Sequence, residues 1–505
     1  MSNISELKTS PAAVSAPAAA TACVAVADAL KDAAGQRRIS PAIVMGLVRL
    51  GEIVTLASTG FAVATAWVGI ADAFDDSRYL VAVMATAIAA AAASQRLELF
   101  TIAALTSPLR QVPKIVLAWT TAMAALVATV FLLKVGPEFS RGWLLLWYAI
   151  GFAAIVLFRY AASVSVHGLA REGRLNRRAV VFGAGPEGQA LIDALEADDG
   201  SDVRICGVFD DRGDDRVATT VRGYPRLGNV DQLVEFCRQT PVDLLIVSLP
   251  ITAESRLLQI LTKLWVLPVD IRLAAHANKL RFRPRAYSFV GRVPLIDLFD
   301  RPLADWDNIV KSTFDRIVAA LALVLLAPVM AAVAVAIRYD SKGPVLFRQK
   351  RFGFNNELID VYKFRSMYTD RSDTNAVKLV TKGDPRVTPV GRFIRKTSLD
   401  ELPQLFNVLS GTLSLVGPRP HALQAKAADR LYHEVVDGYF ARHKVKPGIT
   451  GWAQVNGWRG ETDTSEKIQK RVEHDLYYIE NWSLFFDIYI LARTPVSLLK
   501  SENAY

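Results

Sequence analysis

Four long stretches without a charged residue follow one another in the first third of the chain, at residues 53–70, 79–94, 115–133 and 142–158. Each contains about 16 to 19 residues, and a helix needs roughly 20 to cross the hydrocarbon core of a bilayer. Buried helices of a soluble protein explain the pattern less well, because four such stretches in succession are unusual in a soluble chain. We therefore expect four transmembrane helices within residues 41–160, preceded by a low-complexity tail at residues 1–40.

Lysine and arginine residues beside these stretches indicate how the helices cross the membrane. They gather before the first stretch, between the second and third, and after the fourth: Arg37, Arg38, Arg49, Arg96, Arg110, Lys114, Arg159, Arg171, Arg174, Arg177 and Arg178. Cytoplasmic loops carry the excess of these residues, so we expect both the N-terminus and the chain after residue 160 on the cytoplasmic side. The tail lacks the order of features of a cleaved signal peptide, so the first stretch is expected to be retained.

The net charge of +10 favours an anionic partner: a nucleic acid, a phospholipid surface or a phosphorylated substrate. Nucleic acid is the weakest of the three, because the basic residues flank apolar segments and no known nucleic-acid-binding module is present. The cysteines are Cys23, Cys206 and Cys237, without C-x-x-C spacing, which argues against a disulfide framework and a zinc knuckle. We expect a lipid bilayer and no nucleic acid among the partners.

The middle region, residues 161–300, alternates short strand-like runs with helical ones and is expected to form a Rossmann-like α/β domain. Gly183, Gly185 and Gly188 join a strand-like run to a helical segment, and Asp210 ends the next such run. Glycines at these places let a phosphate approach a helix N-terminus, and the carboxylate can hold a ribose. These four residues are candidates for binding a nucleotide, although such loops also occur as plain strand-to-helix turns. The chain has no Tyr-x-x-x-Lys pair, which argues against short-chain dehydrogenase chemistry.

The C-terminal region, residues 301–505, begins with a fifth apolar segment. Residues 317–337 are uncharged and are interrupted near their centre by Ala327 and Pro328. A central proline removes a backbone hydrogen bond and kinks a helix. We therefore expect a re-entrant membrane helix at about residues 314–338, which enters the inner leaflet and returns, rather than a fifth crossing that would place the rest of the chain outside the cell.

Seven sequence blocks in the C-terminal region carry the densest functional signal. They are residues 343–349 (GPVLFRQ), 363–367 (KFRSM), 384–387 (DPRV), 391–395 (GRFIR), 397–407 (TSLDELPQLFN), 414–420 (SLVGPRP) and 446–457 (KPGITGWAQVNG). In this order, and over about 200 residues, the blocks closely resemble the bacterial sugar transferases, which are polyprenyl-phosphate hexose-1-phosphate transferases. With its four apolar stretches and Rossmann-like middle, the whole chain resembles the long form that starts exopolysaccharide or O-antigen repeat units.

The resemblance implies a mainly α-helical, α+β catalytic domain in the bacterial inner membrane. Its expected reaction moves hexose 1-phosphate from a UDP-hexose to undecaprenyl phosphate, with release of UMP, through a covalent aspartyl intermediate. Glucose is the first expectation for the hexose and galactose the second. A membrane-anchored NAD-dependent nucleotide-sugar dehydratase or epimerase, and a non-catalytic scaffold for polysaccharide assembly, remain the alternatives. The oligomeric state cannot be read from the sequence, which is compatible with a homodimer.

Asp400 and Glu401 are the candidate catalytic pair. They follow Thr397 and Ser398, whose residue types cap helix N-termini, so we expect both carboxylates near a helix start. Adjacent helical residues point about 100° apart, so one carboxylate can face a phosphorus atom while its neighbour holds Mg²⁺. The resemblance implies that Asp400 is the nucleophile and Glu401 the Mg²⁺ ligand. The candidate substrate-binding residues, most of them suited to a diphosphate, are Lys363, Arg365, Arg386, Arg395, Arg419 and Asp487.

Overall fold

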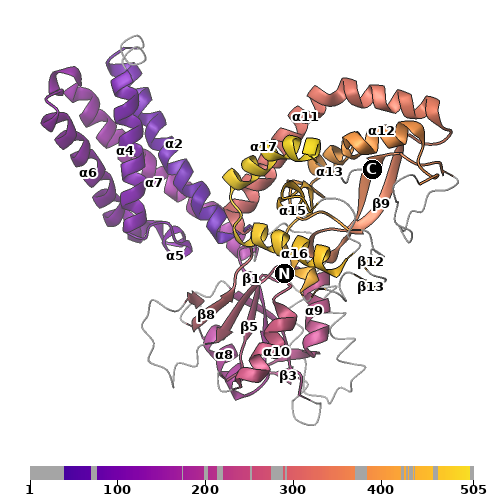
Figure 1. Ribbon diagram of the computed structural model, residues 1–505. Helices are drawn as coiled ribbons and strands as arrows, with labels where there is room; N and C mark the ends of the chain where they lie inside the picture. The colour runs from indigo at the N-terminus through magenta and orange to yellow at the C-terminus, as the bar shows by residue number, and fades with distance from the viewer. Residues whose placement is uncertain are drawn as a thin grey trace. The chain divides into compact units, whose positions relative to one another are not determined.

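The computed structural model describes residues 39–69, 77–172, 174–197, 203–212, 220–250, 253–274, 288–290, 293–369, 384–421, 426–427, 430–431, 436, 438–458 and 464–500. The described chain forms two compact units that meet in sequence between Asn176 and Arg177. The first unit is helical, and the second contains a mixed sheet followed by a mainly helical region (Figure 1). Each unit has a hydrophobic core of its own.

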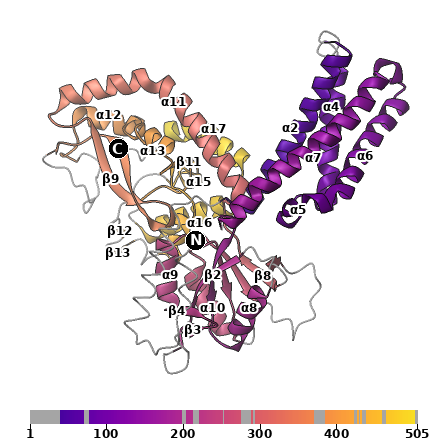
Figure 2. The same ribbon diagram turned by 180° about the vertical axis from the view of Figure 1, so that it is seen from behind.

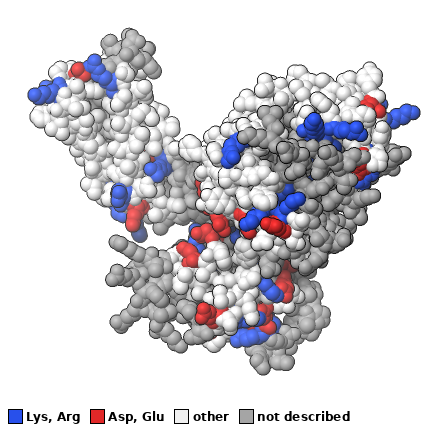
Figure 3. All heavy atoms as spheres, viewed as in Figure 1, with Lys and Arg blue, Asp and Glu red and all other residues white. Residues whose placement is uncertain are grey.

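The first unit consists mainly of long apolar helices. They are α2 (Pro41–Trp67), α4 (Ser77–Arg96), α6 (Pro108–Leu132) and α7 (Arg141–Arg171), with the short helices α5 (Ile102–Thr106) and η2 (Gly136–Glu138) between them. Each long helix contains a stretch that is long and apolar enough to cross a membrane. On the face seen in Figure 3, charged side chains of this unit gather toward the helix ends. The predicted series of apolar helices is confirmed, and the chain is a membrane protein.

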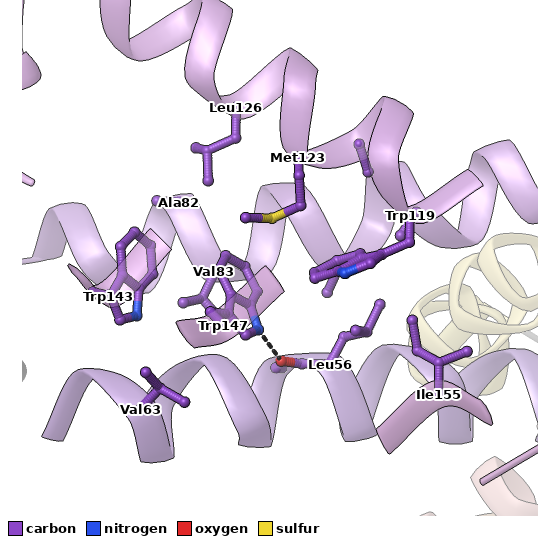
Figure 4. Packing of buried hydrophobic residues seen from close by; sticks show 14 of the residues in the cluster. Leu56, Val63, Ala82, Val83, Trp119, Met123, Leu126, Trp143, Trp147 and Ile155 are labelled. Atoms are coloured by element: carbon purple, nitrogen blue, oxygen red, sulfur yellow. Dashed lines mark hydrogen bonds between the residues drawn. The ribbon is translucent and has the colours of Figure 1, made fainter. Parts of the chain in front are cut away.

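Tryptophan side chains fill the centre of the helical unit. Trp119, Trp143 and Trp147 are almost completely buried (Figure 4). The indole nitrogen of Trp147 donates to the carbonyl oxygen of Leu56 at 3.2 Å, and that of Trp143 donates to the carbonyl oxygen of Gly60 at 3.1 Å. A Cβ atom on Gly60 would lie 2.8 Å from the Trp147 ring, so α2 carries a glycine where this side chain of α7 packs against it. These two buried indole N–H groups are thus satisfied by backbone carbonyl oxygens of α2.

One ion pair lies inside this apolar unit. Glu52 on α2 and Arg159 on α7 are 2.5 Å apart, and their side chains are 2% and 4% exposed. Glu52 also accepts from the Ser94 hydroxyl, and Arg159 donates to the carbonyl oxygen of Leu99. Charged groups at membrane depth are costly unless they are paired, which these two are. Arg159 therefore fixes the contact between helices, a role that its position directly after the fourth apolar stretch did not predict.

The second unit begins with an eight-stranded sheet in the order β3-β4-β2-β1-β5-β6-β8-β7. Its strands are β1 (Arg177–Phe182), β2 (Val203–Phe209), β3 (Thr220–Val221), β4 (Tyr224–Gly228), β5 (Leu244–Val247), β6 (Asp270–Ala274), β7 (Ser288–Val290) and β8 (Val293–Phe299). Helices α8 (Pro186–Glu196), α9 (Val230–Gln239) and α10 (Glu254–Leu264) alternate with the strands. The central strands β4, β2, β1, β5 and β6 are parallel, as expected for the Rossmann-like middle domain.

The C-terminal region contains one long helix, α11 (Asp305–Asp340), and a series of shorter elements. They are β9 (Leu346–Phe352), η4 (Phe354–Asn356), β10 (Leu358–Phe364), α12 (Pro389–Thr397), η6 (Leu399–Glu401), α13 (Gln404–Ser410), β11 (Ser414–Val416), β12 (Lys426–Ala427), β13 (Arg430–Leu431), η7 (Tyr439–Lys444), β14 (Gly448–Thr450), α15 (Trp452–Val455), α16 (Ser465–Glu480) and α17 (Leu484–Lys500). Strands β9 and β10 form an antiparallel hairpin, and α13 packs along α11. The region is therefore mainly helical.

Helix α11 continues through Pro328 and changes direction between its two halves (Figures 1 and 2). Near its start, Asp315 accepts a hydrogen bond from the Ser414 hydroxyl at 2.7 Å. At its end, Arg365 donates to the carbonyl oxygen of Ser341 at 2.7 Å. Both ends thus contact the same C-terminal region. Between them, the exposed apolar side chains are Ile317, Leu321, Val324, Leu325, Val329 and Val335.

Candidate active site

Asp400 and Glu401 lie in a tight turn between α12 and α13. The turn is entered through Ser398, whose φ of 60° is left-handed and costs a non-glycine residue on the order of 1 kcal/mol. Thr397 is the last residue of α12, and the Ser398 side chain makes no capping hydrogen bond. Ser398 does stand at the N-cap position of η6, so the prediction of both carboxylates near a helix start is confirmed, whereas the predicted capping by the side chains of Thr397 and Ser398 is wrong. Both carboxylates lie in the single 3₁₀ turn η6, which allows cations from several elements to surround them.

Two cations hold the Glu401 carboxylate, and both donate to the same oxygen, Oε1. Lys363, on β10, donates to Oε1 at 2.9 Å. Arg419, which follows β11, donates to Oε1 at 2.5 Å and to Oε2 at 3.1 Å. Burial alone would raise the pKa of Glu401, but Arg419 and Lys363 outweigh it and hold the pKa well below its usual value. Glu401 is therefore an ionised, fixed carboxylate, and its two partners were both predicted from the sequence.

The neighbouring Asp400 carboxylate has no hydrogen bond or ion pair within the part of the chain that the structure describes. Burial raises its pKa, and the charge of Glu401 adds to this effect. Lys363, Arg395 and Arg419 act in the opposite direction without overcoming it. Asp400 is thus close to cations that stabilise its charge but are not bonded to it. A carboxylate in this state is available to react.

Arg419 is positioned by a buried network. The guanidinium of Arg442, which is 1% exposed, donates to the carbonyl oxygen of Arg419 at 2.9 Å and to Asp475 at 2.5 Å. Arg351 donates to the carbonyl oxygen of the next residue, Pro420, at 2.5 Å. These three supporting residues, Arg351, Arg442 and Asp475, were not predicted from the sequence. No local pattern could have found them, because their roles depend on contacts between distant segments.

The turn also rests on the second half of α11. Leu399 and Leu402, on either side of the two carboxylates, pack against a cluster that contains Val333 and Ile337 of that helix. Phe364, next to Lys363 on β10, belongs to the same cluster. The apolar contact therefore fixes Asp400 and Glu401 relative to the end of the long helix.

Three predicted site residues lie in other hydrogen-bonded clusters. Arg365 donates to the carbonyl oxygens of Lys342 and Ser341 at the end of α11. Arg386 pairs with Asp384 through two nitrogens. The remaining residue, Asp487, is fully buried and makes no contact with the turn among its described partners, which are Lys311 at 2.8 Å, Tyr478 at 2.7 Å and Trp482 at 3.2 Å. The structure thus brings together Asp400, Glu401, Lys363, Arg395 and Arg419, and leaves these three apart.

The glycine loop of the middle domain connects β1 to α8 as the sequence predicts. A Cβ atom on Gly188 would lie 2.0 Å from the carbonyl oxygen of Gly183, so a side chain at this position in the first turn of α8 would clash with the loop. The Asp210 carboxylate accepts from the Ala184 N–H at 2.7 Å and pairs with Arg212 at 2.7 Å. Burial would raise the pKa of Asp210, but its hydrogen bonds with Arg212 and Ala184 lower it. Nucleotide binding by Gly183, Gly185, Gly188 and Asp210 stays a prediction.

The donor set at the turn fits a magnesium ion that arrives with a phosphorylated substrate. Mg²⁺ is usually held by one or two carboxylates together with substrate phosphate oxygens and water. Glu401 supplies a carboxylate of this kind beside Asp400. Among the residues that the structure describes, no group of three or more His, Cys, Asp or Glu side chains could hold a metal ion by itself. The protein groups here suit a shared site rather than a metal cage.

The family model described as bacterial sugar transferase matches residues 306–501, and the model described as CoA-binding domain matches residues 95–275. The chain is 40% identical over 368 residues to an undecaprenyl-phosphate glucose phosphotransferase of Komagataeibacter xylinus, covering 71% of this chain and 66% of that protein. It is 37% identical to a UDP-glucose:undecaprenyl-phosphate glucose-1-phosphate transferase of Xanthomonas campestris pv. campestris, over 74% of this chain and 77% of the relative.

A third relative is named for galactose instead of glucose. It is an undecaprenyl-phosphate galactose phosphotransferase of Salmonella typhimurium, 29% identical over 73% of this chain and 77% of the relative. The chain thus spans about two thirds of the Komagataeibacter relative and about three quarters of the other two. The family match covers the whole region that holds Asp400, Glu401 and the cations around them. The protein described by this sequence belongs to the bacterial sugar transferase family.

Proposed function

We propose that this protein transfers glucose 1-phosphate from UDP-glucose to undecaprenyl phosphate, the first membrane step in making an exopolysaccharide or O-antigen repeat unit. The names of relatives that align with more than 70% of the chain support this reaction and favour glucose over galactose. The observation that carries the chemistry is the unpaired Asp400 carboxylate beside a Glu401 that two cations hold in place.

Asp400 is the nucleophile in the proposed reaction. One of its oxygens attacks the phosphorus that bears the sugar, and the bond from that phosphorus to the UMP oxygen breaks. The products are UMP and a glucose-phosphate ester on the Asp400 carboxylate. An oxygen of undecaprenyl phosphate then attacks the same phosphorus, the bond to Asp400 breaks, and undecaprenyl-diphosphate-glucose leaves with the free carboxylate restored.

Lys363, Arg395 and Arg419 stabilise the diphosphate in this scheme. A hydrogen bond to a charged group contributes roughly 1.5 to 3 kcal/mol, so a few such donors can hold a diphosphate against water. Arg395 lies in the last turn of α12 and has no side-chain partner within the described chain, so it is available to the substrate. Lys363 and Arg419 already hold Glu401 and would share their remaining donors with the phosphate oxygens.

Glu401 is the proposed Mg²⁺ ligand. An ion held by this carboxylate would supply positive charge that offsets the charge of the diphosphate oxygens. Because Lys363 and Arg419 keep Glu401 ionised, its carboxylate is ready to bind a cation without first losing a proton. Chelation with EDTA should therefore abolish UMP release, and added Mg²⁺ should restore it. Full activity in excess EDTA would remove the metal from the scheme.

Helix α11 is proposed to enter and leave the inner leaflet on the cytoplasmic side of the bacterial inner membrane. Two observations support this placement over a full crossing: both ends of the helix contact the same C-terminal region, and the helix changes direction between its halves. The basic residues beside the N-terminal helices favour the same orientation. This placement holds Asp400 on the side where UDP-glucose is made and next to the phosphate of a lipid acceptor.

A single assay tests the proposed function. The purified full chain is incubated with UDP-glucose and no acceptor, and its intact mass should increase by one glucose phosphate. The Asp400→Asn variant should show no increase, whereas Asp231→Asn, which changes an exposed aspartate on α9, should behave like the wild type. Undecaprenyl phosphate should then remove the added mass. A labelled Asp400→Asn chain would overturn the proposal, and a product with an altered sugar mass would favour a dehydratase or epimerase.

A further inference from the structure

A cavity of about 120 Å³ lies beside the first turns of α11, away from the Asp400 turn. Four cationic side chains from separate segments line it: Lys311, Arg316, Lys444 and Lys446. The carboxylate of Asp315, which pairs with Lys311, also lines it, and apolar residues and the serine hydroxyls of α11 and β11 form much of the remaining wall. A cavity of this composition suits a ligand that is anionic at one end and apolar at the other.

Two of the four cations already have partners. Lys311 is ion-paired with Asp487 at 2.8 Å and with Asp315 at 3.3 Å. The ammonium group of Lys444 lies 5.7 Å from the centre of the Trp265 ring. These contacts account for the charge of Lys311 and cover the ammonium of Lys444 with an aromatic face. The remaining two cations, Arg316 and Lys446, decide what the cavity can bind.

Arg316 and Lys446 have no hydrogen bond or ion pair through their side chains within the described part of the chain. Both face Gly411, the residue that ends α13 with a φ of +83°. A Cβ atom on Gly411 would lie 3.2 Å from Nη2 of Arg316 and 3.7 Å from Nζ of Lys446. The two cations therefore converge on one place that no side chain fills. Burial lowers the pKa of Lys446, and the nearby Arg316 lowers it further, whereas Asp315 acts in the opposite direction without overcoming them.

The position of Arg316 in the sequence gives the depth of the cavity in the proposed membrane placement. Arg316 is the last charged residue before the uncharged run at residues 317–337. The next residue, Ile317, and Leu321 one turn later are 56% and 66% exposed. If α11 enters the inner leaflet as proposed above, this boundary lies at the level of the lipid headgroups, and acyl chains can lie along the exposed apolar side chains.

We propose that this cavity binds the headgroup phosphate of an anionic membrane phospholipid, with Arg316 and Lys446 as its ligands. The site is separate from the reaction site. Helix α13 separates Gly411 from the catalytic turn, and its seven residues alone span about 10 Å. The bound lipid would therefore anchor the start of α11 without occupying the place of the reacting phosphate. This inference rests on the proposed membrane placement of α11.

Native mass spectrometry of the full chain in detergent tests the site. Phosphatidylglycerol and phosphatidylcholine are added separately, and the retained lipid is counted per folded chain. The wild type should retain phosphatidylglycerol in preference to phosphatidylcholine. The Arg316→Gln/Lys446→Gln variant should retain at least about tenfold less phosphatidylglycerol than the wild type, because two charge-assisted contacts are removed. The matched control is Lys263→Gln/Lys470→Gln, which removes two exposed cations elsewhere in the same unit and should retain lipid like the wild type.

Three outcomes would overturn the assignment. The first is equal retention of the two lipids, which would mean that the net charge of the headgroup is not recognised. The second is displacement of phosphatidylglycerol by inorganic phosphate, which would make this a general anion site. The third is a double variant that retains phosphatidylglycerol like the wild type but has a lower melting temperature in the absence of lipid. That result would mean that the two cations stabilise the carboxyl end of α13 instead of binding lipid.

UMP release separates this inference from the proposed function. The double variant should release UMP from UDP-glucose at the wild-type rate in detergent without anionic lipid, because neither changed residue touches the turn. A wild-type chain that retains phosphatidylglycerol but releases no UMP would contradict the proposed function alone.

Discussion

Two aspartates of the C-terminal region, Asp400 and Asp487, have opposite surroundings. Asp487 is fully buried, accepts hydrogen bonds from Tyr478 and Trp482, and pairs with Lys311. Asp400 has no such partner within the described chain, although cations lie nearby. Buried polar groups in proteins are almost always satisfied, so Asp487 has the surroundings of a structural carboxylate. Asp400 has those of a reactive one, and the two can be told apart only by their contacts.

The largest effect expected from this contrast is that of Asp400→Asn. Removing the nucleophile should lower UMP release at least about 1,000-fold. The same change removes a partly buried charge that has no partner, so the melting temperature should stay the same or rise. Activity and thermal unfolding of one preparation measure both effects. A large loss of melting temperature would mean that Asp400 also supports the fold.

Arg419→Lys should have the next largest effect. Lysine keeps the positive charge but cannot contact both Glu401 oxygens as the guanidinium does. We expect kcat/KM for UDP-glucose to fall by about 10- to 100-fold. Lys350→Arg, an exposed exchange on β9, serves as the control for a changed cation in this region. Wild-type kinetics in Arg419→Lys would show that positive charge alone suffices at this position.

Asp487→Asn should change stability more than turnover. The substitution leaves Lys311 with a weaker set of partners and should lower the free energy of unfolding by about 1 to 3 kcal/mol. UMP release per folded molecule should stay within a few fold of the wild type. The test compares thermal unfolding with turnover corrected for the folded fraction. A stable but inactive Asp487→Asn protein would restore the sequence-based prediction that Asp487 binds substrate or takes part in the reaction.

The smallest expected effect is a shift in pH dependence. The pKa of Asp400 is raised, so its reactive form is lost as pH falls through that raised value, and kcat/KM should fall on the acid side. The pKa of Glu401 is held well below its usual value, so Glu401 stays ionised across the same range. Arg395 lowers the pKa of Asp400, so Arg395→Gln should move the acid limb toward higher pH. Arg392→Gln, an exposed change on the same helix, should leave it in place.

The fold was predictable where the signal is local. An uncharged run of membrane length and a glycine loop after a strand each indicate their structure within about 20 residues. Arg159 was not predictable in this way. Its position directly after an uncharged stretch indicates a flanking charge, but its partner Glu52 lies 107 residues earlier. Only the packing of α2 against α7 makes this arginine an internal residue.

The turn that holds Asp400 and Glu401 was predictable in its residues but not in its shape. The sequence blocks point to Asp400, Glu401, Lys363, Arg395 and Arg419, and the structure brings these five side chains together. The residue types of Thr397 and Ser398 predict side-chain capping that the structure lacks. Ser398 adopts a left-handed backbone conformation, which residue type alone does not predict. Arg442 and Asp475 lie 33 residues apart, and their support of Arg419 arises only when η7 packs against α16.

Leu399 and Leu402 pack against Val333 and Ile337 of α11. This packing couples the position of the Asp400 turn to the position of the long helix. A carboxylate on a flexible loop would meet the acceptor phosphate at whatever height the loop adopted. With the turn fixed to α11, the height of Asp400 above the acyl chains is set by how deeply the apolar part of that helix sits. In the proposed placement, a polyprenyl chain could therefore present its phosphate while remaining dissolved in the bilayer, and the enzyme would never need to extract it.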